Sequence, residues 1–332
     1  MIFQTPILAL LLVSALSSLV LIWAGWFAIR VLLRWNLASG SRRQLEMERA
    51  THLVSTLLAF VMLAQLLSLL LFVFNADRMS SLFVGAMCAV GTLNMNAWGF
   101  PTLYAKIAIF FTASVWLMLD RADRTGRDYP LTRVKYALVL LIAPLVLAAS
   151  ALELTYFLNL HADVITSCCS TAFTPETEGI AAEMSSLSPA QALWLLGLTG
   201  AGVVLTGAVS YGLKRGATVF GLAAMVFYGA ALVAIVSVIS GYIYEHPNHH
   251  CPFCILKPEY GYFGYALYVP LFLGAAFALG AGALQPFRHV ESLAATLPAR
   301  IRQQVSLSLA FFAIFGLVVL YTIWNSALIL FG

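Results

Sequence analysis

The sequence predicts an all-α membrane protein: a polytopic transmembrane helical bundle of about 8 spans, with the N- and C-termini on the outer, extracytoplasmic side. Hydrophobic residues make up 61% of the chain and charged residues only 10%, far outside the averages for soluble domains. The apolar runs are continuous, and each is long enough for a helix of about 20 residues, which crosses a hydrocarbon core of roughly 30 Å. We therefore expect a single integral membrane domain over residues 1–332.

The expected spans follow the apolar runs in chain order. The positive charge of the first run follows it, so we expect a retained helix and not a cleaved signal peptide. Pro101 suits the first turn of the third span, because its missing N–H would have no partner there. Ser188-Pro189 is a helix start for the fifth span, and Thr174-Pro175 indicates a short surface helix before it. The expected spans cover residues 7–33, 53–74, 101–119, 136–158, 190–213, 218–242, 262–284 and 305–331.

The distribution of positive charge predicts the orientation. Of the 18 Lys and Arg residues, all but Arg78, Lys106 and Lys257 fall in or beside the expected inner loops. Because Lys and Arg accumulate on the cytoplasmic side, the outer loops are then 75–101, 159–189 and 243–261. We expect a bacterial inner membrane with these loops in the periplasm. The basic inner loops explain the orientation and imply no nucleic-acid partner.

All five cysteines fall in these three outer loops, although the loops are assigned without reference to cysteine. In an oxidising compartment, such cysteines form disulfides, bind metal or take part in thiol exchange. Cys251-Pro252-Phe253-Cys254 is a C-x-x-C motif, and at the start of a helix its first sulfur would favour the thiolate form. Redox exchange, metal binding and a structural disulfide all remain open for this pair.

The other loop cysteines also allow several interpretations. Cys168 and Cys169 are adjacent, so they can form a strained, reducible disulfide, bind a soft ion together, or pair with different distant cysteines. Cys88 stands alone in its loop, beside Met87. Methionine in such a loop either packs against its neighbours or offers a thioether to copper. The candidate metal ligands besides the cysteines are His246, His249, His250, His161 and Met87.

Tyrosines follow the C-x-x-C motif. They are typical of the aromatic belt at a membrane interface, and a quinone pocket beside Cys254 is the alternative. For that pocket the candidate residues are Lys257, Tyr260 and Tyr262.

Two charged residues lie inside the expected spans. Lys106 and Glu153 are each one or two turns from the outer end of their spans, where a charge is costly unless it is paired or hydrated. They form either a structural ion pair or a proton path that serves the loop thiols. No expected span carries a central histidine, and Cys254 is followed by Ile255, so we predict no haem.

Two short pieces of the chain resemble known families. Cys251-Pro252-Phe253-Cys254-Ile255, at the outer end of a membrane helix, resembles the quinone-linked C-x-x-C of the DsbB-type disulfide-generating oxidases. Cys88-Ala89-Val90-Gly91-Thr92, with Trp98-Gly99-Phe100, resembles the outer loop of the vitamin K epoxide reductases. The resemblance implies electron flow from a soluble thiol partner, through loop cysteines, to the C-x-x-C pair and a membrane quinone. This chain departs from both families, which have fewer helices and a second loop cysteine that has no counterpart near Cys88. Cys168 and Cys169 would therefore take over the shuttle role.

We therefore expect a thiol–disulfide oxidoreductase, in which Cys88 or the pair Cys168 and Cys169 exchanges with an extracytoplasmic thiol protein while Cys251 and Cys254 pass electrons to a quinone. One alternative is a protein that binds, delivers or transports a soft metal of the copper or mercury type, with an extracytoplasmic metal donor or acceptor as partner. The absence of Cys, His or a Met ladder inside the spans weakens the transport version. A second alternative is a membrane subunit whose disulfides brace its loops for docking a partner.

Overall fold

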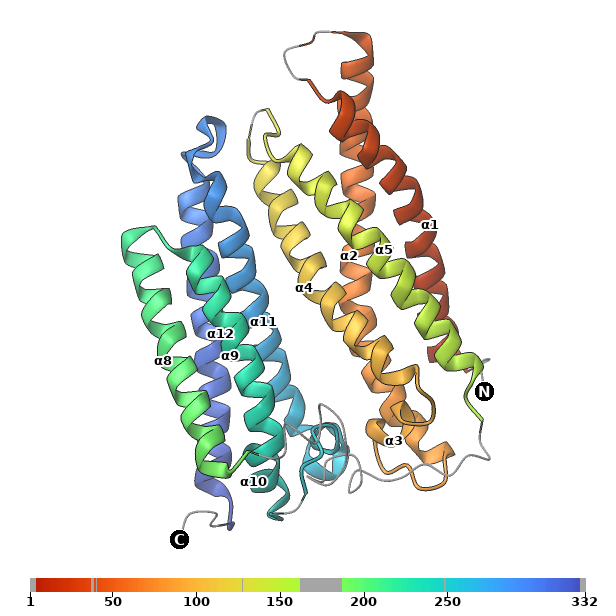
Figure 1. The fold of residues 1–332 in the computed structure, drawn as a ribbon, viewed down its shortest axis with the longest axis vertical. Coiled ribbons are helices and arrows are strands. Elements are labelled where there is room, and N and C mark those ends of the chain that lie inside the picture. Colours follow the sequence, from red (N-terminus) through yellow and green to blue (C-terminus); the bar gives the residue numbers. More distant parts are fainter. Residues whose placement is uncertain are drawn as a thin grey trace. The chain divides into compact units, whose positions relative to one another are not determined.

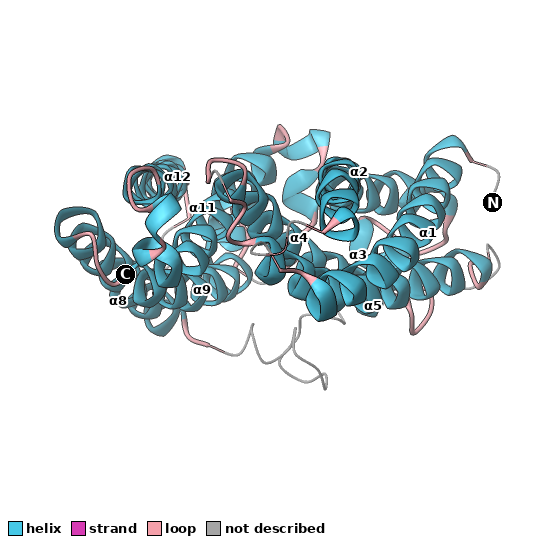
Figure 2. Ribbon diagram, turned by 90° about the horizontal axis from the view of Figure 1, so that it is seen from above, coloured by secondary structure: helices cyan, strands magenta, loops and turns pink. Residues whose placement is uncertain are grey.

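The computed structural model describes residues 4–36, 39, 41–126, 128–161, 187–247 and 249–328, and these residues contain helices but no strand (Figures 1 and 2). Eight helices among these described residues are long and apolar enough to cross a membrane, in agreement with the sequence. Cys168, Cys169 and the surface helix expected at Thr174 lie outside the described residues. The long helices are α1 (Thr5–Arg34), α2 (Arg42–Met79), α4 (Gly99–Asp123), α5 (Thr132–Leu158), α8 (Pro189–Leu213), α9 (Ala217–Ala234), α11 (Phe263–Leu284) and α12 (Leu297–Asn325).

Several shorter elements complete the fold. Helix α9 continues through a π-helical turn (Ile235–Ile239) into α10 (Ser240–Tyr244), and these three segments together form one span. The short helix α3 (Ala89–Leu93) follows α2. The 3-10 turns are η1 (Ser80–Leu82), η3 (Cys254–Leu256), η4 (Pro258–Tyr260), η5 (Gln285–His289) and η6 (Glu291–Leu293).

The helix ends differ from the expected spans where polar residues continue a helix. Helix α2 begins at Arg42 and not at residue 53, which adds about three turns. The i,i+4 pair Arg42–Glu46, 2.9 Å from Nε to Oε1, supports the first of them. Helix α12 likewise begins at Leu297 and ends at Asn325, several residues before the expected end. Hydropathy marks the part of a helix that suits lipid, so it misses polar turns outside the membrane. The expected start at Ser188 is confirmed, since its side chain accepts the Gln191 N–H in a capping box.

The chain groups into two compact units, a grouping that the sequence does not predict. Unit 1 contains Met1–Asn75, Asn96–Leu160 and Pro286–Pro298, and unit 2 contains Ala76–Met95, His161–Gln285 and Ala299–Gly332. Each unit is described by itself. In Figure 1, the red-to-yellow helices α1, α2, α4 and α5 belong to unit 1, and the green-to-blue helices α8, α9, α11 and α12 belong to unit 2.

The core of unit 1 lies between α1, α2, α4 and α5. Trp116 and Tyr136 are fully buried in it, and Trp116 Nε1 donates a hydrogen bond to the Lys135 carbonyl oxygen at 3.0 Å. The ring of Tyr136 meets that of Phe27 edge to face, and its hydroxyl reaches Ser55 Oγ at 3.2 Å. These aromatic side chains bury large apolar surfaces while their polar atoms are satisfied.

Small residues bring the helices of unit 2 close together. A Cβ on Gly221 of α9 would lie 3.0 Å from the Ala278 carbonyl oxygen of α11, and one on Gly282 would lie 3.2 Å from the Ala217 carbonyl oxygen. Such contacts through small residues are common between membrane helices. Ser308 of α12 donates to the Gly274 carbonyl oxygen of α11 at 2.7 Å. Large apolar side chains such as Trp324, 89% exposed, lie on the outer surfaces of the helices, as expected for contact with lipid.

Candidate functional site

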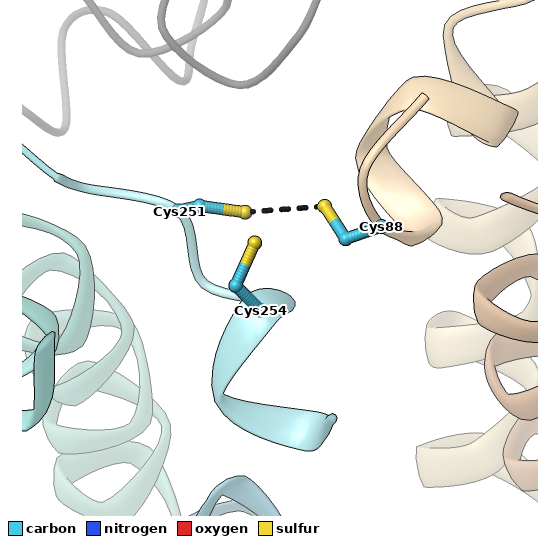
Figure 3. A group of neighbouring side chains, drawn as sticks. All are labelled: Cys88, Cys251 and Cys254. Carbon is cyan, nitrogen blue, oxygen red and sulfur yellow. Dashed lines mark hydrogen bonds between the residues drawn. The ribbon is translucent and has the colours of Figure 1, made fainter. Parts of the chain in front are cut away.

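Three cysteine side chains of unit 2 converge on one another. The Sγ atoms of Cys88 and Cys251 lie 3.5 Å apart, and the Sγ atoms of Cys88, Cys251 and Cys254 all lie within 4.8 Å of one another (Figure 3). The side chains are buried, with exposures of 0%, 0% and 6% respectively. We call this group the cysteine triad. It brings together two of the three outer loops that the sequence predicts to carry cysteine.

The segment around Cys88 is held by local contacts. Cys88 is the N-cap residue of α3 and has an extended backbone, with φ −156°. The Asp77 carboxylate at the end of α2 accepts the backbone N–H of Ala89, the residue that follows Cys88. Gly91 is required one turn later, because a Cβ there would lie 2.7 Å from the Cα of Ala86. These contacts hold the backbone on both sides of Cys88 and so limit where its side chain can lie.

The C-x-x-C segment does not open a membrane helix, which corrects the expectation from sequence. Cys254 begins the three-residue 3-10 turn η3, and α11 starts only at Phe263. A turn of this length cannot supply the aligned dipoles of a helix N-terminus. Depression of the thiol pKa of Cys251 by a helix dipole therefore has no structural basis here.

Two tyrosines fix the backbone of the C-x-x-C motif. Tyr244 Oη donates to the Cys251 carbonyl oxygen at 2.5 Å, and Tyr268 Oη donates to the Pro252 carbonyl oxygen at 2.8 Å. Gly264 of α11 also packs against η3, where an added Cβ would lie 2.8 Å from side-chain atoms of Ile255 and Leu256. The sequence predicted no role for Tyr244, and it distinguished Tyr268 in no way from the other tyrosines that follow the motif.

The π turn anchors the residues that precede Cys251. Its Val236 carbonyl oxygen accepts from Ser240 Oγ at 3.0 Å and lies 3.1 Å from His250 Nδ1. Ser240 Oγ also reaches the His249 carbonyl oxygen at 3.4 Å. Because a π turn interrupts the regular hydrogen-bond ladder of a helix, it offers a carbonyl to a side chain from elsewhere. The two residues directly before the C-x-x-C motif, His249 and His250, are thus bonded to the π turn and to the start of α10.

The predicted nitrogen and thioether ligands do not join the cysteine triad. Among the described residues, only the three sulfurs form a group of His, Cys, Asp and Glu ligand atoms close enough to share one metal ion. His246 and His161 are exposed, Met87 is 65% exposed, and the ring of His249 packs on Tyr244 with centroids 4.1 Å apart. Burial lowers the pKa of His249 and so favours its neutral form.

The predicted quinone-binding residues lie on the segment that follows Cys254. The rings of Tyr260 and Tyr244 meet edge to face at 4.7 Å, and Tyr244 in turn contacts the Cys251 carbonyl. Burial, with a smaller contribution from Cys254, raises the pKa of Tyr260, which therefore keeps its phenolic hydrogen. Tyr262 is 52% exposed and has a left-handed backbone, with φ 56°. Lys257 is half-buried, and its N–H donates to the Cys254 carbonyl oxygen at 3.0 Å. These residues offer aromatic faces and hydrogen-bond donors.

The two charged residues predicted inside the spans form an ion pair in unit 1. Lys106 Nζ lies 3.0 Å from Glu153 Oε1 and donates to Ser68 Oγ at 2.7 Å, while Ser14 Oγ donates to the other oxygen of Glu153. Lys106 and Glu153 are almost completely buried. Four helices therefore meet at one paired charge, which is the arrangement that makes a charge tolerable inside a membrane.

A second buried charge cluster in unit 1 was not predicted. Lys135 Nζ lies 2.9 Å from Asp120 Oδ1 and 2.7 Å from Asp123 Oδ2, and Asp123 Oδ1 also accepts the Leu131 N–H at 2.7 Å. A cavity of about 130 Å³ adjoins this charge cluster, and none of the predicted site residues lines it. Its lining consists of Trp35, Glu48, Thr51, His52, Ser55, Arg124, Asp128, Tyr129 and Lys135.

The cysteine triad is the strongest candidate site among the described residues. Three neighbouring sulfurs can exchange a disulfide among themselves, or they can hold one soft metal ion. Comparisons with protein-family models, with curated proteins and with solved structures found no match to this chain.

Proposed function

We propose that this chain is a membrane thiol–disulfide oxidoreductase that passes electrons between extracytoplasmic thiols and a membrane quinone. The observation that supports this proposal is the 3.5 Å separation of Cys88 Sγ and Cys251 Sγ, with Cys254 Sγ within 4.8 Å of both. Disulfide exchange requires an attacking sulfur beside a disulfide whose second sulfur can leave. The cysteine triad contains one sulfur for each of these roles.

In the proposed reaction, the Cys251 and Cys254 thiols first give two electrons and two protons to a quinone, so that a disulfide bond forms between them and the quinone becomes the quinol. Cys88 then loses its proton and attacks Cys251. The bond between Cys88 and Cys251 forms, the bond between Cys251 and Cys254 breaks, and the electron pair stays on Cys254 as a thiolate. A second thiol then attacks Cys88 and releases Cys251.

The burial of the cysteine triad favours an internal shuttle. Cys88 has 0% exposure, so a folded protein substrate cannot reach its sulfur. The thiol that attacks Cys88 must therefore come from a small molecule or from another part of this chain. We assign this step to Cys168 and Cys169, which then exchange with an extracytoplasmic thiol protein. In this proposal the outer loops face the periplasm of a bacterial inner membrane, because disulfides persist there.

The quinone is assigned to the segment after Cys254. Lys257, Tyr260 and Tyr262 would hold its head group through hydrogen bonds and ring contacts, close to the sulfur that gives up electrons. The quinone supplies a two-electron acceptor soluble in the bilayer. The residues of the chain position the thiols and keep water away from them.

The decisive experiment counts thiols in the purified full-length protein. The fully reduced protein is mixed with a soluble ubiquinone or menaquinone analogue, quenched with a maleimide mass tag, and analysed by mass spectrometry. We expect the loss of two or four taggable thiols together with formation of quinol. The Cys254→Ser variant should lose this reaction, and the Cys88→Ser variant should still form the Cys251–Cys254 disulfide but fail to pass it on.

Two outcomes would contradict the proposal. Thiol pairs that stay closed until the protein is denatured, whatever quinone or quinol is added, would indicate disulfides that only brace the loops. A wild-type protein whose thiol count does not respond to quinone, although its thiols can be tagged, would exclude the quinone-linked reaction.

A further inference from the structure

We propose that the reduced cysteine triad binds one copper(I) ion through the sulfur atoms of Cys88, Cys251 and Cys254, in a three-coordinate site made only of sulfur. The proposal rests on the geometry of these residues and does not depend on the proposed function. It also replaces the mixed sulfur, nitrogen and thioether ligand set expected from the sequence with a smaller one.

The spacing of the three sulfurs fits a single ion. A metal–sulfur bond of about 2.3 Å places three sulfurs in a planar trigonal site about 4.0 Å apart. The Cys88–Cys251 sulfur distance is 3.5 Å, and no pair of the three sulfurs is more than 4.8 Å apart. The Cys88–Cys251 pair is thus about 0.5 Å from the trigonal spacing, and the other two pairs exceed that spacing by at most about 0.8 Å.

The number of donors favours copper(I) over zinc(II). Zinc in structural sites is almost always four-coordinate, also where all its ligands are cysteines, whereas copper(I) is a soft ion that thiolate ligands select. Within the described residues, no histidine nitrogen or carboxylate oxygen joins the three sulfurs. His250 directly precedes Cys251, but its Nδ1 lies 3.1 Å from the Val236 carbonyl oxygen, and the ring of His249 packs against Tyr244.

The surroundings of the site are rigid and dry. All three cysteine side chains are buried, which shields a bound ion from water and from dissolved oxidants. The hydroxyls of Tyr244 and Tyr268 hold the carbonyls of Cys251 and Pro252, so the two sulfurs of the motif are pre-positioned. Ligands fixed in this way by outer contacts bind metal more tightly.

A carboxylate lies on the segment that carries Cys88. The Asp77 carboxylate accepts the Ala89 N–H, and its Oδ1 atom is buried without a hydrogen-bond partner among the described residues. Negative charges on Asp77 and Cys88 repel each other, whereas Lys257 attracts the Asp77 carboxylate. A cation held by Cys88 would reduce this repulsion.

A bound ion and a disulfide exclude each other in this site. A bond between Cys251 and Cys254 removes two of the three ligands, and an ion bound to all three sulfurs leaves none of them able to attack. Copper(I) should therefore bind only the reduced protein. When it is bound, it should stop thiol exchange.

The test is a titration of the reduced full-length protein with copper(I) under anaerobic conditions, in competition with the colorimetric chelator bathocuproine disulfonate. We expect one ion per chain, and X-ray absorption should show three sulfur neighbours. Each of the variants Cys88→Ser, Cys251→Ser and Cys254→Ser should weaken copper(I) binding by at least about 100-fold, since changes outside the ligand shell already cost up to that much. Copper transfer and sulfur count are measured without any activity assay, so failure here is distinct from failure of the proposed oxidoreductase.

Matched controls separate this ligand set from the one expected from sequence. Met87→Leu, His249→Ala and the double variant Cys168→Ser/Cys169→Ser should retain wild-type affinity. The proposal is overturned if the reduced wild type takes no copper from the chelator, if only two sulfurs surround the ion, or if any control variant weakens binding as much as Cys88→Ser. Since the sulfur count is made on the wild type, misfolding of a serine variant does not affect it.

Discussion

Cys88 Sγ lies 3.5 Å from Cys251 Sγ, although 163 positions separate the two residues in the chain. This contact predicts that the Cys254→Ser variant, treated with a mild oxidant, forms a disulfide between Cys88 and Cys251, because the other nearby partner of Cys251 has been removed. Peptide mapping under non-reducing conditions would identify the linked pair. Recovery of Cys251 as an alkylated thiol after oxidation would show that the two sulfurs do not meet in the folded protein.

The tyrosine contacts to the C-x-x-C backbone should control how often the motif opens. We expect Tyr244→Phe and Tyr268→Phe to speed alkylation of Cys251 and Cys254, because each removes one hydrogen bond worth about 0.5–1.5 kcal/mol. That energy corresponds to about a 2- to 12-fold faster reaction, measured by mass spectrometry over time. Tyr321→Phe, at a 60% exposed position on α12, is the matched control and should leave the rate unchanged. Equal rates in all four proteins would show that these two hydrogen bonds do not control the opening of the motif.

Gly264 should tolerate no side chain, because η3 packs directly on it. The Gly264→Ala variant places a methyl group 2.8 Å from atoms of Ile255 and Leu256, and overpacking of this kind costs about 1–3 kcal/mol. We expect a lower melting temperature and faster tagging of Cys254. Gly229→Ala is a suitable control in α9, since a Cβ there has no neighbour within 4 Å. If both alanine variants melt together, the close approach does not constrain the turn.

The ion pair between Lys106 and Glu153 should reveal its role through single and double variants. Removing one partner leaves a buried charge alone and should cost about 3–5 kcal/mol in the free energy of unfolding, whereas Lys106→Met/Glu153→Leu should cost far less. Unfolding of the protein in mixed detergent micelles, followed by intrinsic fluorescence, measures both.

The same double variant distinguishes the two interpretations of this pair. If the pair only joins the helices, the folded double variant should oxidise its thiols with quinone at the wild-type rate. A proton path would instead give a folded protein in which this rate falls and varies more steeply with pH.

The fold was predictable because the bilayer imposes a simple rule on the sequence. Each span is a continuous apolar run, and the described part of the chain contains eight such helices. The hydropathy pattern did not predict the start of α2 at Arg42, because the first turns of this helix are polar and are stabilised by side-chain pairs. The grouping into two units depends on which helices pack together. A helix that is apolar on every side gives little indication of its neighbours in the sequence pattern.

The candidate site was predictable only in part. Cysteines are rare and chemically distinctive, so Cys88, Cys251 and Cys254 could be named from their positions in the expected loops. Asp77 and Tyr244 could not, because aspartate at a helix end and tyrosine near a membrane interface are common and act here through single contacts. His249 and His250 were predicted as ligands from their position beside the motif, but sequence proximity does not specify the direction of a side chain.

The π turn at Ile235–Ile239 has a consequence for how the chain tolerates insertions and deletions. A π turn contains one residue more than an α turn, and each residue of a helix rotates the next residue by about 100° about the helix axis. Deleting one residue here would preserve a hydrophobic span of nearly the same length, yet it would turn Ser240 and Tyr244 away from the loop that they hold. The position of the Cys251 and Cys254 thiols thus depends on the number of residues in the membrane helix that precedes them in the chain.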